Sequence, residues 1–128
     1  MDKFVILLEQ LKSAASRLDE VLKQEKNSFM RDSAIQRFEI CFDLAWKTLK
    51  TFLEEKRGVI CQSPKKCFRE GFSQGLLEHD TLWLAMTDDR NLTAHLYRES
   101  MADEVYARLP KYLENVQSLI LSLRDSDQ

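Results

Sequence analysis

The chain has 128 residues, 44% of them hydrophobic and 31% charged, and its formal net charge is −2 at pH 7. This profile is typical of one globular domain with a single core, and it excludes a protein that coats nucleic acid through an overall positive field. A domain of this size gains stability by burying more apolar surface against a second copy. We therefore expect one domain over residues 1–124 that forms a homodimer, with a frayed tail at 125–128.

Apolar residues recur at spacings of three and four almost everywhere, and only three glycines and two prolines occur. This pattern predicts an all-α chain. A first helix is expected within residues 2–25, where the apolar positions form one stripe. The stripe consists of Phe4, Leu7, Leu8, Leu11, Ala14, Leu18, Val21 and Leu22.

A long second helix is predicted from Asp32 or Ser33, either of which can cap it, to Gly58, which suits a left-handed C-terminal cap. Ile40 and Leu44 lie opposite its main apolar stripe, so we expect this helix to contact more than one neighbour. The stripe itself is typical of a core or a subunit interface. It contains Ile35, Phe38, Phe42, Ala45, Trp46, Leu49, Phe52 and Leu53.

Ser63 and Pro64 predict the start of a third helix, with serine at the cap and proline at the first helical position. Gly71 and Gly75 disfavour helix, so this helix should be short.

Asp80 can cap a fourth helix, which is expected to run through residues 90–97, and Ser100 can cap a fifth. Pro110 removes a hydrogen bond from the fifth helix without ending it, because the apolar period continues to Leu123. Long amphipathic helices with short connections favour antiparallel neighbours. The expected fold is an all-α, antiparallel up-and-down four-helix bundle with an additional short helix.

Cys41, Cys61 and Cys67 show no paired CxxC spacing, so we expect reduced thiols. A metal cluster of Cys61, Cys67 and His79 is the alternative, but our expectation is no metal and no cofactor. No apolar run approaches the roughly 18 residues of a membrane span, and the opening MDKFVILLEQLK is amphipathic. A cytoplasmic protein without a membrane partner is therefore expected.

Positive charge is concentrated in residues 47–69, where the only acidic residues are Glu54 and Glu55. A local contact with RNA or with a partner protein is one interpretation. The other is a solvated helix end and loop, since Lys56 and Arg57 also complement a helix C-terminus. The candidate contact residues are Lys47, Lys50, Lys65, Lys66 and Arg69.

The stretch RNLTAHLY, residues 90–97, gathers versatile polar side chains. On a regular helix Arg90 and Tyr97 fall within about 20° of each other, whereas His95 falls about 140° from Arg90 and near Asn91. A twofold dimer through this helix would bring two Arg90 and two His95 side chains around one cleft. The site would then be composite.

Histidine titrates near neutral pH, so His95 could accept a proton from a ribose 2′-hydroxyl. Arg90, always charged and fork-shaped, could hold the phosphate and stabilise its developing charge. Such chemistry needs no metal, and DNA should resist it. A structural histidine on a helix is the alternative that spacing alone favours.

Asp89 falls inside the apolar stripe of the fourth helix, where a carboxylate needs a partner. We expect a structural pairing with Arg31, Arg37 or a backbone amide.

The same stretch, residues 90–97, matches the R-x4-H-x-Y pattern of HEPN-domain toxins of the HepT type. The chain resembles, more closely still, the small helical nucleotidyltransferase substrate-binding proteins, which are encoded beside a minimal nucleotidyltransferase. The similarity extends over nearly the whole chain. The segments that resemble that family's helices, in order, are AIQRFEICFDLAWKTLKTFLEE, SPKKCFREGF, WLAMTDDRNLTAHLY and ARLPKYLENV.

This resemblance implies a dimeric four-helix bundle in which Arg90 and His95 are a metal-independent ribonuclease pair and Asn91 is the polar residue after the arginine. Tyr97 matches the tyrosine that, in HepT toxins, the partner nucleotidyltransferase modifies with AMP to silence the toxin. The implied function is that of a toxin-like endoribonuclease neutralised by a nucleotidyltransferase encoded nearby.

Two other functions stay open. The chain could be a non-catalytic substrate-binding or structural subunit of a two-component nucleotidyltransferase, whose Arg90 and His95 hold a nucleotide or contact the partner. It could also be a plain structural dimer. The sequence has no Gly-rich phosphate loop and no acidic metal pair, so the partner must supply any nucleotidyl transfer.

Overall fold

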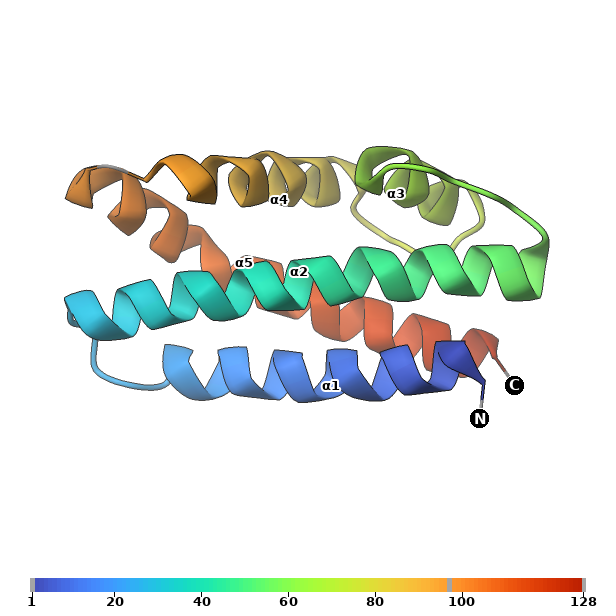
Figure 1. Ribbon diagram of the computed structural model, residues 1–128, viewed down its shortest axis with the longest axis horizontal. Coiled ribbons are helices and arrows are strands. Elements are labelled where there is room, and N and C mark those ends of the chain that lie inside the picture. Colours follow the sequence, from blue (N-terminus) through green and yellow to red (C-terminus); the bar gives the residue numbers. More distant parts are fainter. Residues whose placement is uncertain (1, 97, 128) are drawn as a thin grey trace.

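The computed structural model describes residues 2–96 and 98–127, and in these it contains helices and no strand. Four long helices alternate in direction along the molecule, and a short one extends their upper layer (Figure 1). This is the predicted antiparallel up-and-down four-helix bundle with an additional short helix. The elements are α1 (Lys3–Leu22), α2 (Ser28–Arg57), α3 (Pro64–Ser73), α4 (Asp80–Leu92), the 3₁₀ turn η1 (Thr93–His95) and α5 (Glu99–Ser126).

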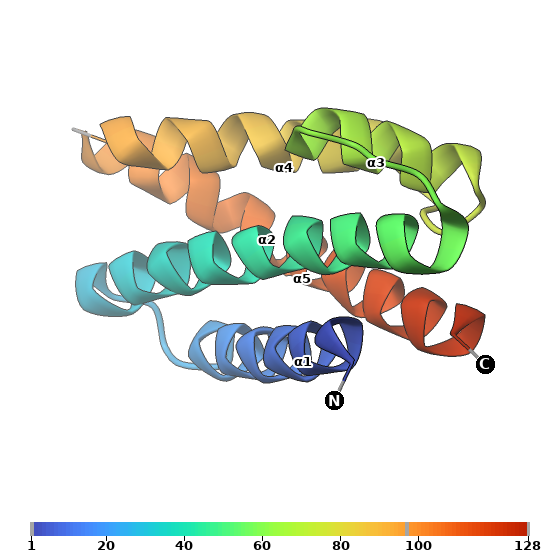
Figure 2. The same cartoon turned by 45° about the vertical axis from the view of Figure 1, so that its right-hand side comes forward.

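The central helix is α2. It lies between α1 on one side and the layer of α3 and α4 on the other, and α5 crosses behind it (Figure 2). Aromatic rings join α2 and α3 to their neighbours, which explains why α2 needs apolar residues over a wide arc. The ring pairs, with centroid separations, are Phe4 with Phe52 at 5.2 Å, Phe38 with Tyr112 at 5.5 Å, Phe42 with Phe68 at 5.7 Å and Phe68 with Trp83 at 4.5 Å.

The start of α2 differs from the prediction. Asn27 is the cap, and its side-chain oxygen accepts from the backbone N–H of Met30 at 2.8 Å. Asp32 and Ser33, the predicted caps, therefore lie inside the helix. Asparagine caps as well as serine does, and the earlier start adds a turn of backbone hydrogen bonds.

Two other predicted helix ends are confirmed. Ser63 caps α3, its hydroxyl accepting from the backbone N–H of Lys66 at 3.4 Å, and Pro64 is the first helical residue. Gly58 ends α2 in the left-handed conformation, with φ of 67°.

At α4 and α5 the predicted caps are shifted by one or two positions. His79 precedes α4, and Asp80 is its first residue. Arg98 precedes α5 without a side-chain cap, which places Ser100 in the first turn. As predicted, α5 continues past Pro110, and it reaches Ser126, so helix extends into the segment expected to fray.

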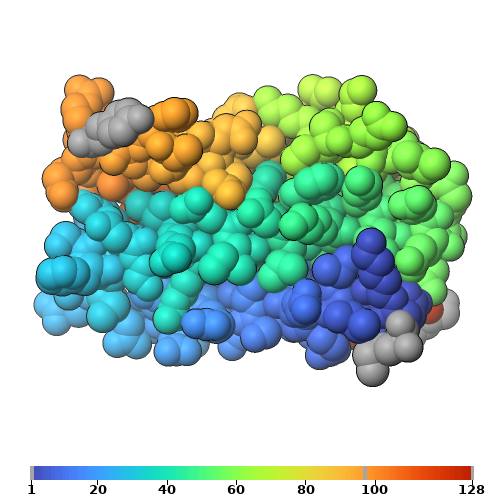
Figure 3. All heavy atoms as spheres, in the orientation of Figure 1, coloured from blue at the N-terminus to red at the C-terminus, as the bar shows by residue number. Residues whose placement is uncertain are grey.

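The face shown in Figure 3 exposes α2 between α1 and the layer of α3 and α4. The most exposed large apolar side chains are spread over separate elements, with Phe29 at 82% on α2 and Ile60 at 70% in the connector after it. Within the described residues, no helix combines the length and hydropathy that a membrane crossing requires.

Candidate functional site

The motif lies where α4 ends, at the end of the bundle opposite the chain termini (Figure 1). Arg90 is in the last turn of α4, whereas His95 is in the 3₁₀ turn η1. The Thr93 hydroxyl donates to the Arg90 carbonyl at 2.7 Å and so satisfies one acceptor left open at the helix end. The expectation of regular helix through residues 90–97 was wrong, and the angle derived from it does not apply.

Arg90 is held by two carboxylates of α2. Its Nε and Nη2 donate to the two oxygens of Asp43, each at 3.2 Å. Its Nη1 donates to Glu39 at 2.9 Å and to the Thr93 hydroxyl at 3.3 Å. Neither Glu39 nor Asp43 was a candidate from the sequence, and their separation of four residues, one turn of α2, was the available signal.

The two carboxylates determine the electrostatics of Arg90. The hydrogen bonds that Arg90 donates to Asp43, followed by the charges of Asp43 and Glu39, raise the Arg90 pKa, so the side chain is a permanent cation. The Arg90 side chain is 27% exposed, and those of Glu39 and Asp43 are 30% and 41% exposed. The group therefore lies at the surface, within reach of an anionic ligand.

Asn91 and His95, the other candidate catalytic residues, are both exposed. Asn91 follows Arg90 in the last turn of α4, and His95 closes η1. The modification candidate Tyr97 lies outside the described residues. The structure thus brings Arg90, Asn91 and His95 to one end of the bundle.

A buried cation lies at the same end. Arg31 of α2 is only 5% exposed, and it donates to Glu99 in the first turn of α5, to Asp32 at 2.9 Å and to Asp103 at 3.3 Å. Lys26 pairs with the same Asp103 oxygen at 2.9 Å. These contacts fasten the start of α5 to the start of α2.

A hollow of about 300 Å³ lies beside this cluster, and Leu96 of the motif stretch lines it together with Arg31, Arg98 and Glu99. The hydrogen bond from Arg31 is the main cause that lowers the Glu99 pKa. Hydrogen bonds from Lys26 and then from Arg31 lower the pKa of Asp103. Glu99 and Asp103 are therefore ionised at neutral pH, and the cluster was not predicted from the sequence.

The five candidate contact cations do not form one patch. Lys47 and Lys50 line a hollow between α1 and α2, and the Lys50 ammonium lies 5.6 Å from the ring centre of Trp46. Lys65 pairs with Asp88 of α4 at 2.8 Å. Lys66 and Arg69 lie at a third location, where they line a hollow of about 390 Å³ together with the connector after α2.

The expectation of three reduced thiols was wrong for two of them. Cys61 and Cys67 form a disulfide, with Cα atoms 5.2 Å apart, because the connector folds back against the first turns of α3. Both sulfurs are used, so the alternative metal cluster with His79 is not formed. Among the described residues no group of three or more metal-ligating side chains occurs. Cys41 is a buried free thiol, and burial raises its pKa to about 12.

Asp89 has a structural partner, as expected, but not one of those named. Arg108 of α5 donates from Nε at 2.7 Å and from Nη2 at 2.9 Å, and the Tyr112 hydroxyl donates at 2.6 Å. The hydrogen bond to Asp89 is the main cause that raises the Arg108 pKa. Arg31 and Arg37 bond elsewhere.

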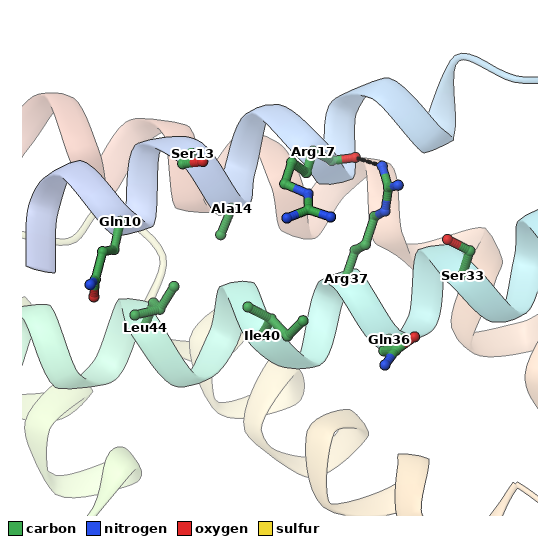
Figure 4. A pocket seen from close by; sticks show the side chains of 9 residues that line it. All are labelled: Gln10, Ser13, Ala14, Arg17, Ser33, Gln36, Arg37, Ile40 and Leu44. Carbon is green, nitrogen blue, oxygen red and sulfur yellow. Dashed lines mark hydrogen bonds between the residues drawn. The ribbon is translucent and has the colours of Figure 1, made fainter.

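A further hollow, of about 420 Å³, lies between α1 and α2 (Figure 4). Arg37 spans it and donates to the backbone carbonyl of Arg17 at 2.6 Å. Ile40 and Leu44 line it, and the packing of α2 against α1, α3, α4 and α5 confirms that this helix contacts more than one neighbour. None of the described motif residues lines this hollow.

Comparison with known proteins assigns the family. The family model described as nucleotidyltransferase substrate binding protein like matches residues 7–125. The curated Haemophilus influenzae protein named Probable ribonuclease HepT is 31% identical over 99 residues, which are 74% of this chain and 68% of that protein.

Two solved structures share the fold. One, from Thermus thermophilus, has a TM-score of 0.86 at 38% identity, over 89% of this chain and 98% of its own. The other is a Haemophilus influenzae protein described as having the fold of a substrate binding domain of a nucleotidyltransferase. Its TM-score is 0.81 at 27% identity, over 91% of this chain and 98% of its own. The chain therefore belongs to the HepT-like family of nucleotidyltransferase substrate-binding proteins.

Proposed function

We propose that the chain is a HepT-like, metal-independent endoribonuclease of a toxin-antitoxin pair, neutralised by a minimal nucleotidyltransferase encoded nearby. The observation that carries the proposal is the placement of Arg90 and His95 at one end of the bundle, on two sides of a helix break. The 31% identity with a protein named as a probable ribonuclease supports the same reaction.

In the proposed reaction His95 accepts the proton of a ribose 2′-hydroxyl. The oxygen attacks the adjacent phosphorus, which yields a 2′,3′-cyclic phosphate, and the departing 5′-oxygen takes up a proton. Arg90 stabilises the negative charge that develops on the phosphate, and Asn91 contributes a neutral polar contact beside it. A homodimer that pairs two such ends would complete the cleft.

Neutralisation acts on Tyr97 in this proposal. The partner transfers AMP to the Tyr97 hydroxyl, and the added phosphate occupies the site of the substrate phosphate near Arg90. Like charge then repels RNA. Because the AMP phosphate is covalently attached, the block lasts after the partner dissociates.

The surface cations extend the proposed RNA path or contact the partner. Lys66 and Arg69 are exposed and line one hollow, so they present two charges together. Lys47 and Lys50 present two more at a separate location. Lys65 forms an ion pair with Asp88 and should therefore contribute less to the binding of RNA or of the partner.

The second candidate function is a non-catalytic substrate-binding or structural subunit of a two-component nucleotidyltransferase. The observation that favours it is the pairing of Arg90 with Glu39 and Asp43, which uses most of the guanidinium donors for contacts between α4 and α2. The name of the matching family and the description of one structural relative point the same way.

The two functions differ in a cleavage assay. Partner-free protein, shown by mass spectrometry to carry no AMP, is incubated with single-stranded RNA and with DNA of the same sequence in EDTA. The proposal expects cleavage of RNA alone, and a loss of at least about 100-fold in rate for Arg90→Gln.

Arg124→Gln is the matched control, since Arg124 is an exposed arginine near the far end of α5. Its rate should stay within about twofold of the unaltered chain. Equal rates for Arg90→Gln and Arg124→Gln, or no cleavage by the unaltered chain, would favour the binding subunit.

A further inference from the structure

Two carboxylates that the proposed ribonuclease reaction does not require lie against Arg90. Glu39 and Asp43 are one turn apart on α2, and both side chains reach the guanidinium. Asp43 uses both oxygens in the side-on geometry that a phosphate would adopt with an arginine. The carboxylate of Asp43 therefore occupies the edge of Arg90 with which a substrate phosphate would pair.

The donors of Arg90 are nearly all used. A guanidinium has five N–H groups. In Arg90 the Nε hydrogen, both Nη1 hydrogens and one Nη2 hydrogen are directed at Asp43, Glu39 and Thr93. One N–H has no partner among the described residues, so Arg90 cannot grip a phosphate with two parallel hydrogen bonds unless Asp43 or Glu39 is released.

The charges point the same way. Two carboxylates and one guanidinium leave the trio of Glu39, Asp43 and Arg90 with a formal charge of −1, which repels a phosphate. All three side chains keep between a quarter and a half of their surface exposed. Water can therefore solvate the carboxylates once they leave Arg90, and the pairing is reversible.

We propose that Glu39 and Asp43 form a carboxylate clamp that holds Arg90 away from RNA, so that substrate phosphate must displace them before it binds. This proposal rests on the proposed function and adds control to it: the clamp keeps the resting chain a weak RNA binder. Glu39 and Asp43 are positioning residues, because they act through Arg90. Thr93, which contacts Arg90 through a neutral hydroxyl, stays in place when phosphate binds.

The test is a binding measurement that needs no cleavage. A fluorescein-labelled single-stranded DNA keeps the phosphates and lacks the 2′-hydroxyl, and its anisotropy reports the dissociation constant. Asp43→Asn and Glu39→Gln remove one charge each and keep the side-chain shape. We expect about five- to tenfold tighter binding for Asp43→Asn and about two- to threefold for Glu39→Gln, as estimated for one charge near a phosphate at the surface.

The gain must depend on Arg90. In the Arg90→Gln background, Asp43→Asn and Glu39→Gln should change the dissociation constant by less than about twofold. Glu9→Gln is the charge-matched control, since Glu9 is an exposed carboxylate of α1 that pairs with Lys12 at 3.1 Å and lines neither hollow of the candidate contact cations. It should also change binding by less than about twofold.

The clamp is refuted if Asp43→Asn and Glu39→Gln both bind the DNA no more tightly than the unaltered chain does. It is also refuted if the gain in affinity persists in the Arg90→Gln background. Circular dichroism verifies the fold of each variant, and Glu39→Gln carries the test if Asp43→Asn does not fold. A chain that cleaves RNA without an Arg90-dependent gain refutes the clamp alone. A chain that shows the gain and never cleaves refutes the ribonuclease alone.

Discussion

Asp89 and Arg108 form a two-point ion pair, 2.7 and 2.9 Å long, that joins the helix bearing Arg90 to α5. The Tyr112 hydroxyl donates to the same carboxylate at 2.6 Å, and Asp89 is 8% exposed. Asp89→Ala leaves the buried hydroxyl without this acceptor. We expect the free energy of unfolding to fall by about 2 kcal/mol, measured by urea unfolding.

Asp88 provides the control for this substitution. It is the neighbouring aspartate, it is exposed, and it pairs with Lys65 across the surface. Asp88→Ala should change the free energy of unfolding by no more than about 0.5 kcal/mol. Similar losses for the two aspartates would contradict a structural role specific to Asp89.

The disulfide should stabilise the chain. Cys61 and Cys67 are six positions apart, and closing so short a loop lowers the entropy of the unfolded chain by an amount worth about 2 kcal/mol. Dithiothreitol should therefore lower the urea midpoint of the unaltered chain. Cys61→Ser should give the same lowered midpoint with or without the reductant, since it removes the disulfide and leaves Cys41 and Cys67 as thiols. A midpoint that the reductant leaves unchanged would refute the bond in solution.

Acid should weaken the cluster around Arg31. The pKa values of Glu99 and Asp103 lie below their ordinary values of 4.5 and 3.8 in the folded chain, so the folded state binds these protons less readily than the unfolded state does. The resulting stabilisation is complete above the unfolded pKa values and is lost as the pH falls through the folded ones. We expect the free energy of unfolding to decrease below about pH 5.

Arg31→Gln removes the main cause of the Glu99 shift and should flatten this pH dependence. Arg124→Gln, whose guanidinium pairs with the neighbouring Asp125 and with no other carboxylate of the described residues, should leave it as steep as in the unaltered chain. Thermal unfolding followed between pH 3 and pH 7 measures both slopes. If the stability of the Arg31→Gln variant falls with pH as steeply as that of the unaltered chain, the cluster around Arg31 is not the source of the pH dependence.

Gly58 isolates a backbone effect. Its φ is 67°, and a Cβ added there would meet no atom within 4 Å. Gly58→Ala should therefore cost about 1 kcal/mol through left-handed backbone strain alone. Gln62→Ala, at an exposed position of the same connector, should cost less than about 0.5 kcal/mol. Chemical denaturation of the two variants compares these costs.

The spacing of apolar residues predicted the helices well, because each helix must bury one face against its neighbours and that face repeats every three to four residues. Gly58, Ser63 and Pro64 marked helix ends correctly, since each satisfies a local backbone requirement. The start of α2 was predicted wrongly because Asn27 competes with Ser33 as a cap, and local sequence cannot rank two good caps. Helix ends that depend on such competition need the tertiary structure.

The site was predictable in its motif and not in its environment. Arg90 and His95 stand out by spacing, yet Glu39 and Asp43 lie about 50 residues earlier and meet Arg90 only after folding. The 3₁₀ turn after α4 likewise depends on a hydroxyl contact of Thr93 that helix propensity does not encode. Long-range polar partners are therefore what the sequence left open.

The most direct measurement of the proposed function is the initial rate of RNA cleavage in EDTA by two histidine variants of the partner-free chain. His79 and His95 are its two histidines, and both are exposed. We predict that His79→Ala cleaves within about twofold of the unaltered chain and that His95→Ala is at least about 100-fold slower. Equal rates for the two folded variants would contradict a ribonuclease site at His95.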